Sequence, residues 1–375
     1  MKKVAIIGGG VSGVTFALNI QDYAHVTIFE REHSLLLKLL KTGNGKANIY
    51  NRNIELSAYN DHSFMNEHYN LIEVTLDEYF KRRGLLTYTD EEGRVYPYSR
   101  SAKGLKDFLL KDLKVEVKTA TNVTNVTKEK NGYIINGEYY DYLVLATGSS
   151  AGLYKYPLDN NNDPLLNSLK LTRSALVPVI KTIKVKENLK LLHNNRSEVV
   201  MSLWMDGTLL FKEKGEVLFK EDGLSGIVSF VVSSYFEWAY KEHPKANYKI
   251  TLDLIPLLGT LEIKEILKTK EDYDKVFAPF MVSYLKTLKD DNILNNVKAL
   301  SFTPVALNNP ENTQALSGGV LIEAITNDFN LKNDPNLFVL GEVLNIDGIC
   351  GGYNLGFAIY SGIRSSKALL YKLSK

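Results

Sequence analysis

The feature that most constrains the fold is a glycine-rich turn near the start of the chain, placed between an apolar run and a helical pattern. Residues 4–7 (VAII) are typical of a buried parallel strand, and residues 8–13 (GGGVSG) match G-x-G-x-x-G. The pattern predicts a helix from Val11 to about Ile20, then a second strand over His25–Phe29 that ends at Glu30. Such a strand–turn–helix–strand–acid unit predicts dinucleotide binding.

Each part of this unit has a physical task at such a site. Gly8 permits the tight turn, Gly10 lets the backbone approach a pyrophosphate, and Gly13 lets the helix pack on the strand. The helix that follows presents free N–H groups, which favour a phosphate. The carboxylate of Glu30 can accept hydrogen bonds from ribose hydroxyls and would repel a 2′-phosphate, which disfavours NADP at this position.

NAD and FAD share the ADP half, so later segments decide between them. Residues 140–149 predict an apolar strand ending in Ala146-Thr147-Gly148 at the carboxyl edge of the same sheet, although a plain strand with a glycine turn is the alternative. Residues 336–362 predict a further buried strand, an acidic turn, a glycine pair and a helix. A flavin ring lies far from its ADP, and a helix N-terminus near the ring would stabilise reduced flavin. This late return therefore favours FAD.

Composition excludes several other classes of protein. The chain has 375 residues, a net charge of +2, six histidines without metal-ligand spacing, and one cysteine, Cys350. The small charge gives no case for nucleic-acid binding, and one cysteine excludes an internal disulfide. No stretch reaches the roughly 20 apolar residues of a membrane helix. The start, MKKVAII, is broken by glycines and lacks a cleavage site, so we expect a cytoplasmic protein.

The segments between these motifs are mainly structural. Short strands are expected at residues 115–117 and 121–127, where a backbone group near Val123 can meet an adenine edge, and hairpin turns follow at Asn131-Gly132 and Asn136-Gly137. The middle of the chain shows no second dinucleotide fingerprint. Its expected elements are strands within 176–185, 198–204 and 208–213, then helices over 227–240 and 273–288.

The expected fold is α/β, with a discontinuous Rossmann-like FAD-binding domain and an inserted mixed β/α substrate domain. The first part of the FAD-binding domain would cover residues 1–170, the insertion 171–315, and the return segment with its C-terminal helix 316–375. We expect the insertion to roof the flavin and shape a substrate pocket, because sites favour domain interfaces. The alternative is a purely structural cap.

Six segments together carry a resemblance to a known family. They are Gly8–Gly13 with Glu30, KLLKTGNGKANIYN at 38–51, EGRVYPYSRSA at 92–102, LATG at 145–148, GEVLFKEDGLSG at 215–226 and GEVLNIDGICGGYNLGFA at 341–358. In these segments the chain resembles the aminoacetone-oxidase/BaiN-like family of FAD-dependent oxidoreductases, within the glutathione-reductase-like flavoproteins. The segments span almost the whole chain, and the combination is far more specific than any single motif.

The resemblance implies a set of cofactor contacts. On the ADP side these are Gly8, Gly10, Val11, Ser12, Gly13, Glu30, Arg31, Val123, Ala146, Thr147 and Gly148. Under the pyrophosphate and flavin they are Lys38, Thr42, Gly43, Gly45 and Asn48, and at the ribityl chain and ring they are Gly341, Glu342, Asp347, Gly352, Asn354 and Leu355. Asn44 and Asn48 can supply both donors and acceptors to the polar edge of a flavin.

The chain departs from the family pattern at four positions. Lys46 and Ala47 stand where relatives usually carry Arg and Cys, Glu221 stands where His is common, and Ile227 replaces the Pro that usually follows GLSG. We expect the FAD fold to survive these changes.

Catalysis by hydride transfer needs little from the protein beyond placing the substrate carbon against flavin N5. Tyr353, in the glycine-rich turn expected to face the ring, can stack on it or donate a proton. Arg94 can bind an anionic group or a carbonyl, and a surface ion pair is equally expected. Cys350 is a candidate reactive thiol at a helix N-terminus, although packing is the better explanation. No metal site is expected.

The sequence thus predicts an FAD-dependent oxidoreductase that transfers a hydride between flavin N5 and a small organic substrate. By its resemblance the activity is amine oxidation or NAD(P)H-linked reduction of an unsaturated compound, and the sequence does not choose between them. NAD(P)H is a candidate transient electron donor. The expected partner is a small-molecule substrate, with no nucleic acid and no membrane. Two alternatives stay open, an NAD-dependent dehydrogenase and a flavoprotein that acts on tRNA.

Overall fold

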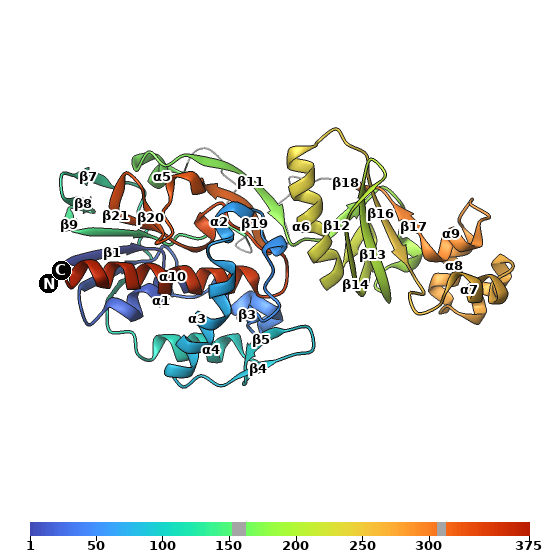
Figure 1. The fold of residues 1–375 in the computed structure, drawn as a ribbon, viewed down its shortest axis with the longest axis horizontal. Coiled ribbons are helices and arrows are strands. Elements are labelled where there is room, and N and C mark those ends of the chain that lie inside the picture. Colours follow the sequence, from blue (N-terminus) through green and yellow to red (C-terminus); the bar gives the residue numbers. More distant parts are fainter. Residues whose placement is uncertain (152–162, 306–312) are drawn as a thin grey trace. The chain divides into compact units, whose positions relative to one another are not determined.

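The computed structural model describes residues 1–151, 163–305 and 313–375, except for the side chain of Asn44. The chain divides into two compact units, which are shown in Figure 1. Unit 1 comprises Met1–Val177 and Ala315–Lys375, and unit 2 comprises Pro178–Gln314. We propose that unit 1 is the nucleotide-binding domain and that unit 2 is its insertion.

Unit 1 is built on a sheet with the strand order β20-β21-β10-β1-β2-β6. Neighbouring strands are parallel, except for the antiparallel pair β20–β21. The strands β1 and β2 each bury their last four residues, as expected for parallel strands covered on both faces. The predicted α/β class with a Rossmann-like sheet is therefore confirmed. The bounds are β1 Lys3–Ile7, β2 His25–Phe29, β6 Glu116–Lys118, β10 Tyr142–Leu145, β20 Asn330–Leu331 and β21 Asp334–Val339.

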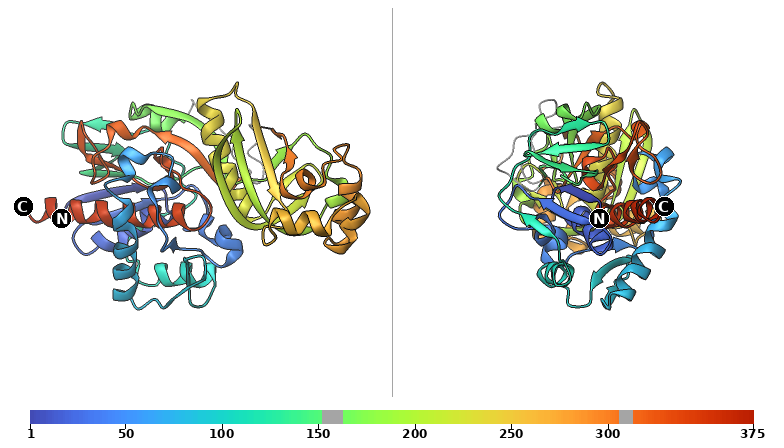
Figure 2. Two further views of the ribbon diagram at one scale, coloured as in Figure 1. Left: turned by 45° about the vertical axis from the view of Figure 1, so that its right-hand side comes forward. Right: turned by 90° about the vertical axis from the view of Figure 1, so that its left-hand side faces the viewer.

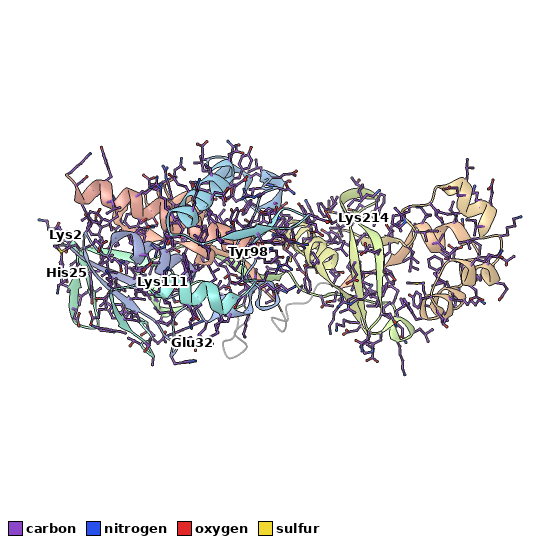
Figure 3. All side chains as sticks on the ribbon, turned by 90° about the horizontal axis from the view of Figure 1, so that it is seen from below. Lys2, His25, Glu32, Tyr98, Lys111 and Lys214 are labelled. Atoms are coloured by element: carbon purple, nitrogen blue, oxygen red, sulfur yellow. The ribbon has the colours of Figure 1, made fainter. Side chains whose placement is uncertain are left out.

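The parallel strands give this sheet a distinct carboxyl edge. Figure 3 shows Lys2 and His25 at the edge where β1 and β2 begin, and Glu32 beyond the edge where β2 ends. Ligands of open α/β sheets bind outside the carboxyl ends of the strands. The site is therefore expected on the side of Glu32.

Two helices from opposite ends of the sequence lie alongside one another in unit 1. The first, α1, spans Val11–Ile20 as predicted, and α10 spans Tyr353–Leu373. Figures 1 and 2 show α10 running beside α1, with both termini of the chain at the same end. The Asn19 side chain of α1 donates a hydrogen bond to the Ser366 hydroxyl of α10 at 3.1 Å. The C-terminal segment is thus packed directly on the first nucleotide motif.

Smaller elements complete unit 1. Its other helices are α2 His62–Met65, α3 Tyr69–Arg82, α4 Ala102–Leu110 and α5 Pro164–Ser168, with 3-10 turns η1 Lys38–Gly45, η2 Leu56–Ala58, η5 Ile322–Ala324 and η6 Gly341–Val343. Three further sheets contain β3 Tyr50–Asn51, β4 Thr87–Thr89 and β5 Arg94–Pro97, then β7 Thr127–Glu129, β8 Gly132–Ile135 and β9 Glu138–Tyr140, then β11 Arg173–Val179 and β19 Ala315–Val320.

The strand predicted over residues 121–127 is wrong, because only Thr127 belongs to a strand. The buried residues of this segment are Val123 and Val126, three positions apart, whereas a half-buried strand buries alternate residues. The Thr121 N–H instead donates to the Glu30 carbonyl at 2.9 Å, so the segment crosses the end of β2 as a loop.

Unit 2 contains an antiparallel sheet in the order β17-β16-β13-β14-β15-β12-β18. A turn at Asp206-Gly207 joins its two longest strands. The helix predicted over 273–288 is wrong as one element, because it is divided before Pro279, which starts its second part. The strands are β12 Ile183–Val185, β13 Arg196–Met205, β14 Thr208–Lys220, β15 Gly223–Ser225, β16 Tyr248–Asp253, β17 Leu300–Phe302 and β18 Pro304–Val305. The helices are α6 Ile227–Glu242, α7 Thr260–Ile266, α8 Pro279–Lys286 and α9 Ile293–Lys298, with 3-10 turns η3 Lys190–Leu192 and η4 Lys270–Lys275.

His68 is buried among aromatic side chains in the core of unit 1. Its Nδ1 lies 3.0 Å from the Tyr360 hydroxyl, and its ring packs on Phe64 and Phe329 at centroid distances of 4.5 and 5.2 Å. Burial, helped by the positive charge of Arg364, lowers the pKa of His68 from 6.5 to about 4.

We expect acid to destabilise the fold through His68. The folded state keeps this histidine neutral down to about pH 4, while the unfolded chain binds the proton near pH 6.5. The stabilisation is therefore complete above pH 6.5 and is lost as the pH falls toward 4. At roughly 1.4 kcal/mol per pKa unit, the loss is about 3 kcal/mol. Urea unfolding near pH 7 and near pH 4 measures it. The His68→Gln protein should lose less free energy of unfolding between these two pH values than the wild-type protein. Equal losses in both proteins would contradict the assignment of this pH dependence to His68.

Within the described residues, no helix combines the length and the apolar character needed to cross a membrane.

Candidate dinucleotide site

The glycine-rich turn joins β1 to α1 at the carboxyl edge of the sheet, and its own packing requires a glycine at position 8. Gly8 has a φ of +106°, and an added Cβ would lie 2.3 Å from the Ala146 carbonyl oxygen. A Cβ on Gly13 would in turn lie 2.3 Å from the Gly8 carbonyl oxygen. The turn is therefore pressed against the end of β10, which brings the GGGVSG and LATG segments together.

Gly10 differs, because the packing of the protein does not require a glycine there. Its backbone is extended, with φ −73° and ψ −178°, and among the described residues an added Cβ would meet only the Ala146 carbonyl oxygen, at 3.9 Å. Gly10 is the N-cap of α1, which has no side-chain cap and no acidic residue in its first turn. Val11 is partly exposed and Ser12 is buried. The room beside Gly10 and the helix N–H groups fit a phosphate.

Glu30 lies directly after β2, and its carboxylate is held beside the turn. Its Oε2 accepts a hydrogen bond from the Gly9 N–H at 2.7 Å, and its Oε1 accepts one from the Glu32 N–H at 2.8 Å. Each carboxylate oxygen has a second lone pair that a ribose hydroxyl can use. Arg31 is partly exposed, with its Nε 4.0 Å from Glu32 Oε1. The arrangement fits the adenosine side of a dinucleotide.

The loop that crosses the end of β2 lies at this same edge of the sheet. The end of β10 lies there as well. Val123 in the loop is 5% exposed. At the end of β10, Ala146 is buried, while Thr147 and Gly148 are partly exposed. The sequence-predicted adenosine-side residues are thus gathered around the carboxyl ends of β1, β2 and β10.

Lys38 connects three segments that are far apart in the sequence. Its Nζ forms an ion pair with Glu342 Oε2 and donates a hydrogen bond to the Ser149 hydroxyl at 3.1 Å. The side chains of Lys38 and Glu342 are 31% and 16% exposed. The second carboxylate oxygen, Glu342 Oε1, is buried and has no hydrogen-bond partner among the described residues. A buried acceptor of this kind fits a ligand that donates a hydrogen bond.

The segment after Lys38 folds back on itself. The Thr42 hydroxyl donates to the Leu39 carbonyl at 2.7 Å, and the Lys46 N–H donates to the Gly43 carbonyl at 3.1 Å. Gly45 ends η1, and beyond it Asn48 carries a buried Oδ1 without a hydrogen-bond partner among the described residues. The predicted contact through the Asn44 side chain lies outside the described part of the structure.

The C-terminal glycine pair presents the N-terminus of α10 to this segment. Gly352 is the N-cap and has a φ of +99°, and α10 has no side-chain cap and no acidic residue in its first turn. A Cβ on Gly352 would lie 2.6 Å from Asn48 Oδ1 and 2.8 Å from the Tyr50 carbonyl oxygen. The structure therefore brings a second uncapped helix N-terminus to the orphaned acceptor of Asn48.

Other residues predicted in this turn make contacts within the protein. The Asn354 side chain accepts a hydrogen bond from the Gly348 N–H at 2.9 Å and donates one to the Gly348 carbonyl at 2.7 Å. The Asp347 N–H donates to Asn60 Oδ1 at 3.0 Å, and the Gly341 N–H donates to the Ser361 hydroxyl at 3.1 Å. Leu355 is partly buried against the core.

The two residues predicted to take part in catalysis are held by the protein. The Tyr353 ring is 8% exposed and meets the Tyr59 ring edge-on, and its hydroxyl donates to the Asn53 carbonyl at 3.1 Å. Arg94 on β5 pairs with Asp90 and Glu92 at 2.8 and 2.7 Å. The polar groups of both residues are thus already engaged within the protein.

Cys350, Lys46 and Ala47, whose roles the sequence leaves open, differ in their surroundings. Burial raises the pKa of the Cys350 thiol to about 11, so it is protonated at neutral pH and is a poor nucleophile. Lys46 is exposed. Ala47, next to it, is buried with a φ of +57°, a left-handed conformation that is uncommon for a residue with a Cβ.

Sequence reasoning missed two residues of this site, Ser149 and Asn51. Ser149 directly follows LATG and contacts Lys38, so its position after that motif was an available signal. Asn51 closes KLLKTGNGKANIYN, is 5% exposed, and donates to the Gly351 carbonyl at 3.1 Å. Within the described residues, no group of three His, Cys, Asp or Glu side chains could hold a metal ion.

A parallel sheet with a glycine-rich strand-to-helix turn at its carboxyl edge defines a Rossmann-type domain. The chain belongs to the family described as HI0933-like protein Rossmann domain, whose model matches residues 2–368. This membership confirms the predicted FAD-dependent oxidoreductase class.

Two characterised proteins and a solved structure are similar to the chain. It is 26% identical over 412 residues to the 3-dehydro-bile acid delta(4,6)-reductase of Clostridium scindens, covering 98% of this chain and 99% of that protein. It is 24% identical over 385 residues to the ribosomal RNA dihydrouridine synthase of Escherichia coli, covering 94% of each. In fold it resembles the 3-ketosteroid delta1-dehydrogenase of Sterolibacterium denitrificans, with a TM-score of 0.51, 11% identity, and coverage of 99% of this chain and 100% of that one.

Proposed function

We propose that unit 1 binds FAD along the carboxyl edge of its sheet, and that the protein reduces a carbon–carbon double bond conjugated to a carbonyl. The observation that carries the cofactor assignment is the second uncapped helix N-terminus, that of α10, which meets the buried Oδ1 of Asn48. The N-terminus of α1 and Glu30 are sufficient to bind the ADP half of a dinucleotide. A cofactor that also reaches the N-terminus of α10 must extend beyond its ADP half, as FAD does with its flavin.

On the ADP side, the first turn of α1 would donate its N–H groups to the pyrophosphate, and Gly10 would leave room for the phosphate. The Glu30 carboxylate, fixed by two backbone N–H groups, would accept from the ribose. We assign to this side Gly8, Gly10, Val11, Ser12, Gly13, Glu30, Arg31, Val123, Ala146, Thr147 and Gly148.

On the flavin side, the buried acceptors Asn48 Oδ1 and Glu342 Oε1 would receive hydrogen bonds from the cofactor. The positive end of α10 would stabilise negative charge on the ring. We assign to this side Lys38, Thr42, Gly43, Gly45, Asn48, Gly341, Glu342, Asp347, Gly352, Asn354 and Leu355. Asn44 belongs to the same segment.

When bound, FAD supplies hydride transfer at its N5 atom. The residues of the chain then have to orient the ring and favour its charge. The ion pair of Lys38 and Glu342 joins two sides of this site, and Ser149 anchors the lysine. The contacts of Tyr353 and Arg94 favour positioning roles for both, because the tyrosine hydroxyl and the guanidinium are occupied within the protein.

The substrate class rests on what two relatives have in common. A 3-keto group beside a delta-4 double bond is an enone, and dihydrouridine differs from uridine by reduction of a double bond conjugated to a carbonyl. The names of both relatives therefore describe chemistry at a conjugated double bond. In such a reduction a hydride adds to the carbon remote from the carbonyl and a proton to the adjacent carbon. We propose NAD(P)H as the transient source of the electrons.

A second candidate function is the reduction of uracil bases in RNA, which the dihydrouridine synthase relative favours. The net charge of +2 gives little general attraction for phosphates. Binding of a structured RNA at low and high salt separates the two candidates. A free small enone as substrate requires no RNA affinity, whereas salt-sensitive RNA binding would support the RNA candidate.

The proposed function predicts a yellow protein with a defined electron donor. The purified chain, incubated with FAD and desalted, should retain flavin absorbance. Under anaerobic conditions NADH or NADPH should bleach it, and a panel of primary amines should not. A protein that stays colourless after FAD addition contradicts the cofactor assignment. Rapid bleaching by an amine, followed by fast recovery in dioxygen, would instead establish an oxidase.

A further inference from the structure

The strongest feature outside these assignments is a pair of hydrogen bonds that fastens the glycine pair before α10 to strand β3. The Asn51 side chain donates to the Gly351 carbonyl at 3.1 Å, and its Oδ1 accepts from the Asn53 N–H at 2.8 Å. In the opposite direction, the Tyr353 hydroxyl donates to the Asn53 carbonyl at 3.1 Å. Residues 51–53 and 351–353 are thus joined from both sides.

We call these three hydrogen bonds the clamp. They hold the Gly351-Gly352 turn, whose backbone is intrinsically flexible. Gly351 and Gly352 have φ values of +134° and +99°, conformations that residues with a Cβ rarely adopt. Glycine carries high conformational freedom, so this turn has little stiffness of its own. Asn51 is 5% exposed, and both ends of its amide are used by the clamp. A buried side chain bonded in this way fixes the backbone it holds.

What the clamp positions is the N-terminus of a long helix. The 21 residues of α10 begin directly after the held turn, without a side-chain cap. The free N–H groups and the positive dipole end act over only about one turn, so a small displacement changes the charge that they present. Nothing else in the KLLKTGNGKANIYN segment bonds to the carbonyl of Gly351 among the described residues.

We propose that Asn51 is a positioning residue that sets how strongly the N-terminus of α10 favours reduced over oxidised flavin. This inference rests on the proposed binding of FAD. Asn51 itself touches the protein backbone, so removing it leaves the ADP-side contacts intact. Its effect should therefore be seen in the redox equilibrium of the bound cofactor more than in cofactor retention.

The test compares the midpoint potential of bound FAD in wild-type protein, Asn51→Leu and Asn51→Ser. Both variants should retain FAD but lose about tenfold of the preference for reduced flavin, which lowers a two-electron potential by about 30 mV. Asn51→Ser keeps an uncharged acceptor for the Asn53 N–H, so it serves if Asn51→Leu fails to fold. The matched control is Asn53→Ala, because Asn53 is exposed and enters the clamp through its backbone alone.

The outcomes separate this inference from the proposed function. A wild-type protein that retains no FAD contradicts the proposed function itself. A yellow wild-type protein whose Asn51 variants keep its potential, even if they melt at lower temperature, overturns the positioning role and leaves Asn51 purely structural. A lowered potential in both Asn51 variants, with Asn53→Ala unchanged, supports it.

Discussion

Gly10→Val should strongly weaken FAD binding while leaving the fold nearly intact. The extended backbone of Gly10 accepts a β-branched residue, and among the described residues the added Cβ meets only the Ala146 carbonyl oxygen, at 3.9 Å. Replacing the glycine N-cap should lower the stability of the fold by about 1 kcal/mol or less. The side chain would instead occupy the approach of the pyrophosphate, and we expect affinity to fall by roughly a hundredfold or more, equivalent to about 3 kcal/mol.

Gly8→Val is the matched control, because it changes the same turn with the opposite result. At a φ of +106°, with an added Cβ 2.3 Å from the Ala146 carbonyl oxygen, it should destabilise the folded chain itself. Thermal unfolding with and without FAD measures both effects. A hundredfold excess of FAD over its Kd stabilises the wild-type protein by about 2.7 kcal/mol, and Gly10→Val, with a hundredfold weaker affinity, should gain only about 0.4 kcal/mol or less. If Gly10→Val binds FAD as wild type does, α1 is not the pyrophosphate site.

Asn48→Leu should weaken FAD binding without weakening the fold. Asn48 Oδ1 is buried and has no hydrogen-bond partner among the described residues, so the folded chain carries the cost of that desolvated oxygen. An apolar side chain of similar size removes the cost, and the cofactor-free protein should unfold at the same or a higher temperature. The holoprotein loses a buried hydrogen bond, which is about 1–3 kcal/mol, or roughly a tenfold to hundredfold loss of affinity.

A buried asparagine in unit 2 provides the comparison for Asn48. The Asn296 side chain in unit 2 is 4% exposed and donates to the Asp290 carbonyl at 2.8 Å and the Tyr273 hydroxyl at 3.2 Å. Asn296→Leu should therefore lower the unfolding temperature and leave FAD affinity unchanged. An Asn48→Leu protein that melts early but binds FAD normally would assign Asn48 to the fold and not to the cofactor.

The parts of the fold that were predicted depend on neighbours in sequence. The unit from Val4 to Glu30 is specified by apolar runs, glycines and a helical period within a short stretch, and α1 begins and ends at the predicted residues. The loop at 121–126 resembles a strand in its sequence because β-branched residues are common there. Its path is decided instead by the hydrogen bond from Thr121 to the Glu30 carbonyl, a contact that no local pattern contains.

The site shows the same division between local and distant information. The cofactor segments could be named from their motifs, but their mutual contacts join residues about 300 positions apart. Lys38 and Glu342 are separated by 304 positions, and Asn51 and Gly351 by 300. The engagement of the Tyr353 hydroxyl by the Asn53 carbonyl also spans 300 positions. A single sequence carries no signal for such pairs, so the clamp and the ion pair appear only in the structure.

The most direct test of the proposed reduction is the anaerobic reoxidation of the bound flavin. The holoprotein is reduced with NADH or NADPH, freed of excess donor, and mixed with a 4-ene-3-keto steroid or with its saturated 3-keto counterpart. We predict that flavin absorbance returns with one equivalent of the enone, that the double bond is reduced in the product, and that the saturated ketone has no effect. Flavin that stays reduced with the enone and recovers only in dioxygen would contradict the account.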